Sequence, residues 1–135
     1  MDCYKVALVD DHAILRKVLR KTLCNCRGIE VVADVSGGAA LLNLLNHLKV
    51  LPDMIILDVS MPQQTGLELA RLIRDLFPNI KILIFTMHNE REYVSQAFKV
   101  GVHGYLLKGD KTEELFAAIE AIRCGQTYRS PLLHS

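Results

Sequence analysis

Apolar runs and amphipathic stretches alternate along the whole chain. Short, largely apolar runs at 6–9, 29–35, 54–57, 80–85 and 103–107 each end in polar or turn-forming residues, which predicts five strands. The stretches between and after them place apolar residues at helical spacing, with polar residues in between, which predicts five helices. The apolar stripes are Leu15, Val18, Leu19 and Leu23; Leu41, Leu44, Leu45 and Leu48; Leu69, Leu72, Ile73 and Leu76; Val94, Ala97 and Phe98; and Leu115, Ala118, Ile119 and Ile122.

Three of the predicted helices are preceded by a capping-box pattern. Its members are Thr65 with Glu68, Asn89 with Glu92, and Asp110 with Glu113. Gly66 is interpreted as a glycine at a helix start. Gly101 and Gly125 are interpreted as helix ends.

Strands that alternate with helices favour an α/β fold. Parallel neighbours need crossover connections, and the helices supply them, so the sheet is expected to be parallel and covered on both faces. Three of the five runs are almost continuously apolar, which is typical of strands buried on both sides.

Composition narrows the class of protein. With 135 residues and a formal net charge of +1, the chain fits one domain and gives no sign of a nucleic-acid or membrane surface. The four cysteines lack paired metal-ligand spacing, which favours free thiols in a reducing cytoplasm. The apolar run near Met1 is only four residues long, too short for a signal peptide or a membrane span.

Chemically active side chains follow four of the predicted strands. They are Asp10 and Asp11, Asp58, Thr86 and Lys108. Alone, Asp58 would be interpreted as a helix cap or a turn residue. In an open parallel sheet, however, the carboxyl ends of the strands meet at one rim, where ligands bind. The sequence therefore predicts three acids, a hydroxyl and an ammonium group at a common site.

Three neighbouring carboxylates repel one another unless something neutralises them. A divalent cation does so, and Mg²⁺ suits hard oxygen ligands and keeps waters that a phosphoryl group can replace. Lys108 can then neutralise phosphoryl oxygens or hold Asp58, and the Thr86 hydroxyl can donate to an oxygen of an attached phosphate.

These motifs together resemble the receiver domain of two-component response regulators, over nearly the whole chain. The motifs are Val-Asp-Asp at 9–11, Leu-Asp-Val-Ser-Met-Pro at 57–62 with Gly66, Phe-Thr-Met at 85–87 and Gly-Tyr-Leu-Leu-Lys at 104–108. The stretches 86–88, 108–110 and 125–128 are similar to the NarL/FixJ (LuxR-type) branch. The resemblance implies a flavodoxin-like (βα)5 doubly wound sheet with five parallel strands in the order 2-1-3-4-5.

The resemblance also implies roles for individual residues. Asp58 would be the phosphoacceptor, and Asp11, Asp58 and the backbone carbonyl of Ser60 would bind Mg²⁺, with Asp10 helping through water. Thr86 and Lys108 would assist the transfer. Thr86 and Tyr105 would form the switch pair, in which the hydroxyl moves toward the phosphoryl group and the ring follows inward.

The implied partners are a sensor histidine kinase, which donates the phosphoryl group, and a second copy of the chain on phosphorylation. Residues 1–126 are expected to form the receiver, and 127–135 to begin a linker to a C-terminal DNA-binding domain that is absent from this sequence. The domain would catalyse its own phosphorylation and dephosphorylation in the cytoplasm, without being an enzyme that turns over an external substrate. It would have no membrane contact and would switch a transcriptional output.

Alternatives remain at this stage. One is a stand-alone receiver without a DNA-binding domain, and another is an interaction module that keeps only the fold. A third is a haloacid-dehalogenase-like phosphohydrolase, which Ser60 disfavours because that class has an acid there. Gly109 stands where the family commonly has a proline in a cis bond, which leaves the geometry of that loop open. Four histidines are interpreted as structural for lack of metal-ligand grouping: His12, His47, His103 and His134.

Overall fold

The structure is a computed structural model, and it describes residues 3–59 and 66–133. Its strands are β1 (Tyr4–Val9), β2 (Ile29–Val35), β3 (Met54–Leu57), β4 (Lys81–Thr86), β5 (Gly104–Leu107) and β6 (Tyr128–Arg129). Its helices are α1 (Ala13–Cys24), α2 (Gly38–Leu45), α3 (Gly66–Leu76), α4 (Arg91–Val100) and α5 (Thr112–Arg123). The strands form one sheet in the order β2-β1-β3-β4-β5-β6, and each neighbouring pair is parallel. The predicted α/β fold and the strand order 2-1-3-4-5 are confirmed.

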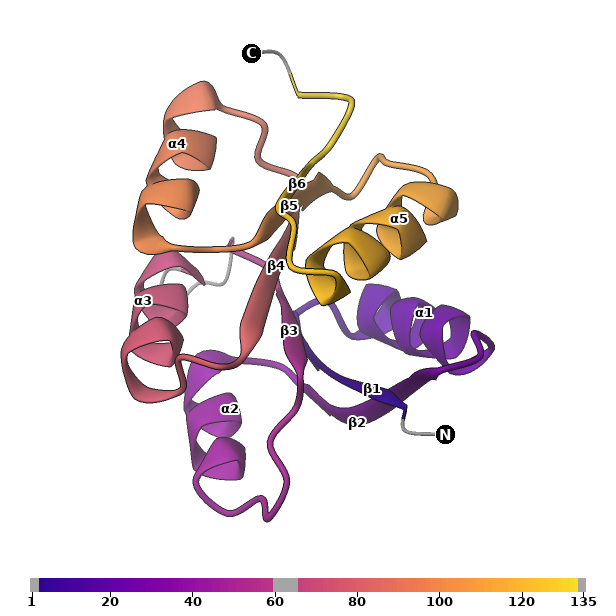
Figure 1. Ribbon diagram of the computed structural model, residues 1–135, viewed down its shortest axis with the longest axis vertical. Helices are drawn as coiled ribbons and strands as arrows, with labels where there is room; N and C mark the ends of the chain where they lie inside the picture. The colour runs from indigo at the N-terminus through magenta and orange to yellow at the C-terminus, as the bar shows by residue number, and fades with distance from the viewer. Residues whose placement is uncertain (1–2, 60–65, 134–135) are drawn as a thin grey trace.

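Helices cover both faces of this sheet. Figure 1 shows α1 and α5 on one side and α2, α3 and α4 on the other. Strand β3 lies at the centre and is buried at every residue. Because successive side chains of a strand point to opposite faces, Ile55 and Leu57 pack with the three-helix layer, while Met54 and Ile56 pack with the two-helix layer. Each such side chain contributes about 2 kcal/mol of burial free energy. The packed sheet therefore holds the residues at the carboxyl ends of its strands in place.

Strand β6 was not predicted, and it extends the sheet beyond the expected five strands. The Tyr128 amide donates to the His103 carbonyl at 3.0 Å, and the Ser130 amide donates to the Tyr105 carbonyl at 2.8 Å. The Arg129 guanidinium lies 4.4 Å from the centre of the Phe98 ring on α4. A two-residue strand is too short to produce a periodic pattern, so it leaves no sequence signal. The segment expected to begin a linker therefore starts as part of the sheet.

The two predicted capping boxes that can be examined are wrong. Helix α4 begins after Glu90 and α5 after Lys111, and neither residue caps its helix through a side-chain hydrogen bond. Asp110 instead accepts a hydrogen bond from the Leu107 amide at 2.8 Å, so its carboxylate closes the turn after β5. The third box begins at Thr65, outside the described residues.

Gly66 begins α3, as expected of a helix-start glycine, but the structure gives it a second role. A Cβ atom at this position would lie 2.3 Å from Val59 Cα and 2.8 Å from the Asp58 carbonyl oxygen. Only a glycine lets the start of α3 rest this closely on the chain that leaves β3.

In the described residues, no helix combines the length and the apolar character that crossing a membrane requires.

Candidate functional site

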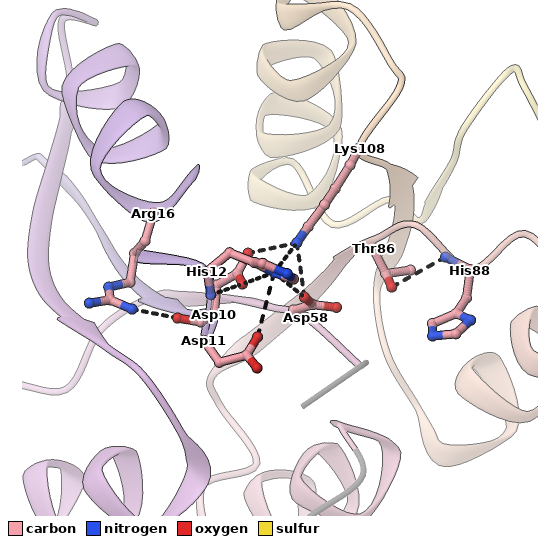
Figure 2. A network of polar contacts seen from close by, with 8 residues as sticks. All are labelled: Asp10, Asp11, His12, Arg16, Asp58, Thr86, His88 and Lys108. Carbon is pink, nitrogen blue, oxygen red and sulfur yellow. Dashed lines mark hydrogen bonds and ion pairs between the residues drawn. The ribbon is translucent and has the colours of Figure 1, made fainter. Parts of the chain in front are cut away.

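The strand register brings the predicted polar residues to one rim. Val9 of β1 is paired with Leu57 of β3, so Asp10 and Asp58 follow at the same height. The Asp58 amide continues the ladder by donating to the Val9 carbonyl at 3.0 Å. Farther along the same sheet, Thr86 of β4 is paired with Leu107 of β5, so Lys108 is the first residue after the end of β5. Figure 2 shows these side chains gathered at one place.

Lys108 bridges the two buried acids. Its Nζ lies 2.9 Å from Asp10 Oδ2 and 2.9 Å from Asp58 Oδ2. All three side chains are secluded, with exposed fractions of 6% for Lys108, 7% for Asp10 and 0% for Asp58. Burial by itself would lower the pKa of Lys108, but the hydrogen bonds and charges of the two carboxylates outweigh it and raise that pKa. The Lys108 ammonium group is therefore a positive charge held in contact with the Asp58 carboxylate.

Asp11 and His12 lie beside the two buried acids, on the side of the site that faces solvent. The Asp11 side chain is 32% exposed, and the His12 ring is 57% exposed. His12 Nδ1 lies 3.2 Å from Asp10 Oδ1, 3.5 Å from Asp11 Oδ1 and 3.8 Å from Asp58 Oδ2. The interpretation of His12 as ungrouped is therefore wrong, because the turn after β1 folds its ring back over the acids. His47 and His103 lie outside this group, and His134 lies outside the described residues.

Arg16 is a second residue whose place the sequence did not reveal. The helical pattern put it on the polar side of the first helix, yet its guanidinium reaches back to the Asp10 carbonyl, 2.5 Å from Nη1 to oxygen. Its Nε also lies 3.3 Å from Asp34 Oδ1, and Arg20 pairs with the same carboxylate. Arg16 therefore ties the acidic turn to α1 and β2. The local sequence around Arg16 does not indicate either contact.

Thr86 and Tyr105 are connected through one residue, His88. The His88 amide donates to Thr86 Oγ1 at 3.4 Å, and the Tyr105 hydroxyl donates to the His88 carbonyl at 2.8 Å. Both Thr86 and Tyr105 are fully buried. Burial, followed by the nearby charge of Glu90, raises the pKa of Tyr105, so its hydroxyl remains a hydrogen-bond donor. Both predicted switch residues are therefore hydrogen-bonded to the backbone of His88 in the loop after β4, and the tyrosine ring points inward.

The acidic side of the rim has the donor groups of a cation site. Asp10, Asp11, His12 and Asp58 each offer a ligand atom, and these atoms all lie within 4.8 Å of one another. Clustered carboxylates suit a hard divalent cation, which would relieve their mutual repulsion. This donor set fits a metal ion. Ser60, whose carbonyl was predicted as a ligand, lies outside the described residues.

The loop after Lys108 has ordinary backbone geometry. The Lys108–Gly109 bond is trans, as are the other peptide bonds in the described part of the chain. The contact between Asp110 and the Leu107 amide closes this turn without a proline. Lys108 thus reaches Asp58 although the family's usual proline is missing.

Comparison with known proteins agrees with this geometry. The family model described as the response regulator receiver domain matches residues 6–120. The oxygen regulatory protein NreC of Staphylococcus epidermidis is 38% identical over 126 residues, which are 92% of this chain and 56% of that protein. The chain spans just over half the length of the curated relatives it matches, with 53% to 58% covered.

Solved structures give the same result. A LuxR-family two-component response regulator from Aurantimonas sp. SI85-9A1 is 35% identical, covers 96% of this chain and 91% of its own, and has a TM-score of 0.89. The isolated REC domain of RcsB from Salmonella enterica serovar Typhimurium, solved in the presence of the phosphomimetic BeF3⁻, is 28% identical over 98% of this chain and 100% of its own, with a TM-score of 0.89. RcsB has also been solved as two dimers bound to two parallel DNAs.

Proposed function

The chain belongs to the response regulator receiver family, in its NarL/FixJ branch, and from this premise we propose that Asp58 accepts a phosphoryl group from the phosphohistidine of a sensor histidine kinase. A receiver is a signalling domain. The proposal adds that this one catalyses its own phosphorylation and later dephosphorylation, with Mg²⁺ as cofactor.

One observation carries the proposal. The Asp58 side chain is fully buried, yet it lies at the rim of the sheet with Lys108 Nζ 2.9 Å from its Oδ2. A buried carboxylate with a fixed cation beside it is held in one orientation, with an oxygen that can act as a nucleophile.

The proposed reaction exchanges one bond for another. A carboxylate oxygen of Asp58 forms a bond to phosphorus while the phosphorus–nitrogen bond of the phosphohistidine breaks and its electron pair stays on the leaving ring. Such transfers need positioning and charge neutralisation more than covalent help from the protein. Lys108 supplies both, because its ammonium group reaches Asp10 and Asp58 at once and can follow the new charge onto the phosphoryl oxygens.

We assign the metal to the acidic side of the rim. Asp11 and Asp58 would hold Mg²⁺ directly with the Ser60 carbonyl, and Asp10 would act through water. When bound, the ion supplies positive charge to the phosphoryl oxygens. Asp10 is suited to an indirect role because both of its carboxylate oxygens already have partners, Oδ1 the backbone amide of His12 and Oδ2 the Lys108 ammonium group.

The proposed switch uses the loop after β4. The Thr86 hydroxyl can donate to a phosphoryl oxygen on Asp58, and its Oγ1 already accepts from the His88 amide. Movement of Thr86 would pull on His88, whose carbonyl holds the Tyr105 hydroxyl. The inward ring in this structure is the arrangement that phosphorylation would favour, in a shift of population between two states.

The parent protein is proposed to be longer than this chain. Residues 1–126 would form the receiver and 127–135 would begin the linker, whose first residues pack on the sheet. The greater length of the relatives and the DNA complexes of RcsB support a C-terminal DNA-binding domain and a dimer on phosphorylation. An open reading frame that ends at Ser135 would contradict the missing domain and favour a stand-alone receiver.

Phosphorylation is tested by incubating the chain with phosphoramidate or acetyl phosphate and Mg²⁺, then measuring the intact mass. We expect one added phosphoryl group, which does not form when Mg²⁺ is chelated beforehand. In Asp58→Asn the group should not form, because an amide is a poor nucleophile.

Asp75→Asn is the matched control, since it makes the same chemical change on an exposed position of α3. It should be phosphorylated like the unchanged chain. A chain whose mass stays constant with Mg²⁺ bound, or an Asp58→Asn variant that still gains the group, would contradict the proposal.

A further inference from the structure

His12 introduces a nitrogen donor at the otherwise oxygen-only cation site. Its Nδ1 lies 3.2 to 3.8 Å from three carboxylate oxygens, those of Asp10, Asp11 and Asp58. It also lies 3.5 Å from Lys108 Nζ. Figure 2 shows the ring lying among the acids and close to the lysine, while the side chain remains 57% exposed. The same ring atom thus faces the three carboxylates and the lysine.

These separations match those between two ligands of one ion. In an octahedral site with bonds of about 2.1 Å, adjacent donor atoms lie about 3.0 Å apart and opposite ones about 4.2 Å apart. The distances from Nδ1 to the two proposed direct ligands, 3.5 Å to Asp11 Oδ1 and 3.8 Å to Asp58 Oδ2, lie in this interval. The ring could therefore join the acids around a single ion with little movement.

The backbone helps to hold the ring there. The His12 amide donates to Asp10 Oδ1 at 2.9 Å, which sets the turn that leads into α1. His12 also stands at the N-cap of α1 but makes no side-chain capping bond, so its ring is not occupied by the helix. The ring is held instead by a hydrogen bond between Nδ1 and Asp10 Oδ1 at 3.2 Å, which a bound ion would replace.

A nitrogen ligand changes which ions a site prefers. Oxygen-only sites suit Mg²⁺, whereas imidazole suits the later first-row metals, whose affinity rises along the series from Mn²⁺ to Cu²⁺. We propose that His12 is a nitrogen ligand of this site, so that it binds first-row transition ions such as Mn²⁺ and Co²⁺ through a mixed nitrogen and oxygen set. This inference rests on the proposed function insofar as both use the carboxylates of the same metal site.

Electron spin echo spectroscopy of the Mn²⁺-loaded chain tests the ligand directly. We expect modulation from a coordinated imidazole nitrogen in the unchanged chain and its loss in His12→Ala and His12→Asn. The second variant keeps a polar residue that favours a helix start, so a fold defect cannot explain a shared loss of signal. His47→Ala is the matched control, because His47 Nδ1 contacts the Asn43 carbonyl at 2.7 Å, away from the site. It should keep the nitrogen signal.

Metal affinity provides a second readout. Co²⁺ binding should weaken about tenfold or more in His12→Asn. Mg²⁺ binding should change by less than about twofold, because its preferred oxygen ligands remain.

The outcomes separate this inference from the proposed function. Mn²⁺ that binds and is displaced by Mg²⁺, yet gives no nitrogen modulation in the unchanged chain, would overturn the role of His12 and leave the magnesium site standing. A chain that binds neither Mn²⁺ nor Mg²⁺ would overturn the metal site itself.

Discussion

Lys108 keeps its positive charge at the rim through the neutral pH range. Its carboxylate partners raise its pKa, although burial alone would lower it. A raised pKa in the folded state stabilises the fold fully below the pKa of the unfolded chain, and this contribution is lost only as pH rises through the folded value. For a lysine this window is alkaline. Any loss of stability between pH 7 and 4 must therefore come from other groups.

His103 is such a group. Burial, together with the charges of Lys81 and Arg74, lowers its pKa from 6.5 to about 4. Its Nδ1 accepts a hydrogen bond from the Ile82 amide at 3.1 Å, which requires an unprotonated nitrogen. Because the unfolded chain takes up this proton first, the contribution of His103 is complete above about pH 6.5 and falls as pH drops toward 4.

We predict a loss of about 1 to 2 kcal/mol from His103 over this range, a value that allows for partial solvent screening. Urea unfolding at a series of pH values would measure it against His103→Asn, whose side-chain oxygen can still accept from Ile82 but does not titrate. The unchanged chain should lose more stability than the variant as the pH falls. Parallel curves would contradict the prediction.

The residues of the site differ in how far the sequence predicts them. Asp10, Asp58, Thr86 and Lys108 were placed together because each follows a strand, and the ends of parallel strands meet by geometry. His12 was missed because its ring joins the acids only through the conformation of the turn after β1. The residues next to His12 in the sequence do not indicate how closely its ring approaches the carboxylates.

At the level of elements, the apolar pattern predicted strands and helices well but not their ends. Strand β3 is recognised because all four residues are apolar and buried. The N-cap residues of α4 and α5 each lie one residue after the predicted ones. At α5 the predicted cap, Asp110, accepts from the Leu107 amide instead. A side chain that can cap a helix can equally close a turn, and local sequence does not decide between them.

The junction between β3 and α3 leads to a prediction for Gly66→Ala. The new methyl group would meet the backbone of Val59 and Asp58, which cannot rotate away as a side chain can. We expect a loss of about 2 kcal/mol or more in the free energy of unfolding, and slower phosphorylation because the Asp58 backbone is displaced. Chemical denaturation and intact mass would measure both.

Gly37→Ala is the control for this substitution. Gly37 has an extended backbone, and a Cβ there would meet nothing within 4 Å. The change should cost only about 0.5 to 1 kcal/mol, because glycine is preferred over alanine at a helix N-cap. An equal effect at Gly37 and Gly66 would show that steric conflict at the β3–α3 junction is not the cause.

On the scale of the whole molecule, β1 and β3 lie side by side in the sheet, and the strand order reverses between them. This position follows from the parallel connections, and it is where ligands bind in such sheets. The alternating pattern predicted only a parallel sheet covered by helices, and the strand order was expected from the resemblance to the receiver family. Strand β6 escaped prediction because it has no helix after it within the described residues and only two residues to identify it.

Strand β6 also protects an open edge. Without it, the outer backbone groups of Gly104 and Tyr105 would be unpaired along a strand whose side chains are all buried. Such an apolar edge is a template for pairing with another molecule. The short strand at Tyr128–Arg129 blocks it with a charged residue and then turns away.

Shortening the chain should therefore change its colloidal behaviour as well as its stability. We predict that a chain ending at Gln126 forms concentration-dependent aggregates, detectable by light scattering after size-exclusion chromatography, and unfolds at a lower temperature. A chain ending at Leu133 keeps β6 and should remain monodisperse. Equal scattering from the two chains would contradict this. The few residues that lead out of the sheet would then be what keeps neighbouring molecules from adding strands to it.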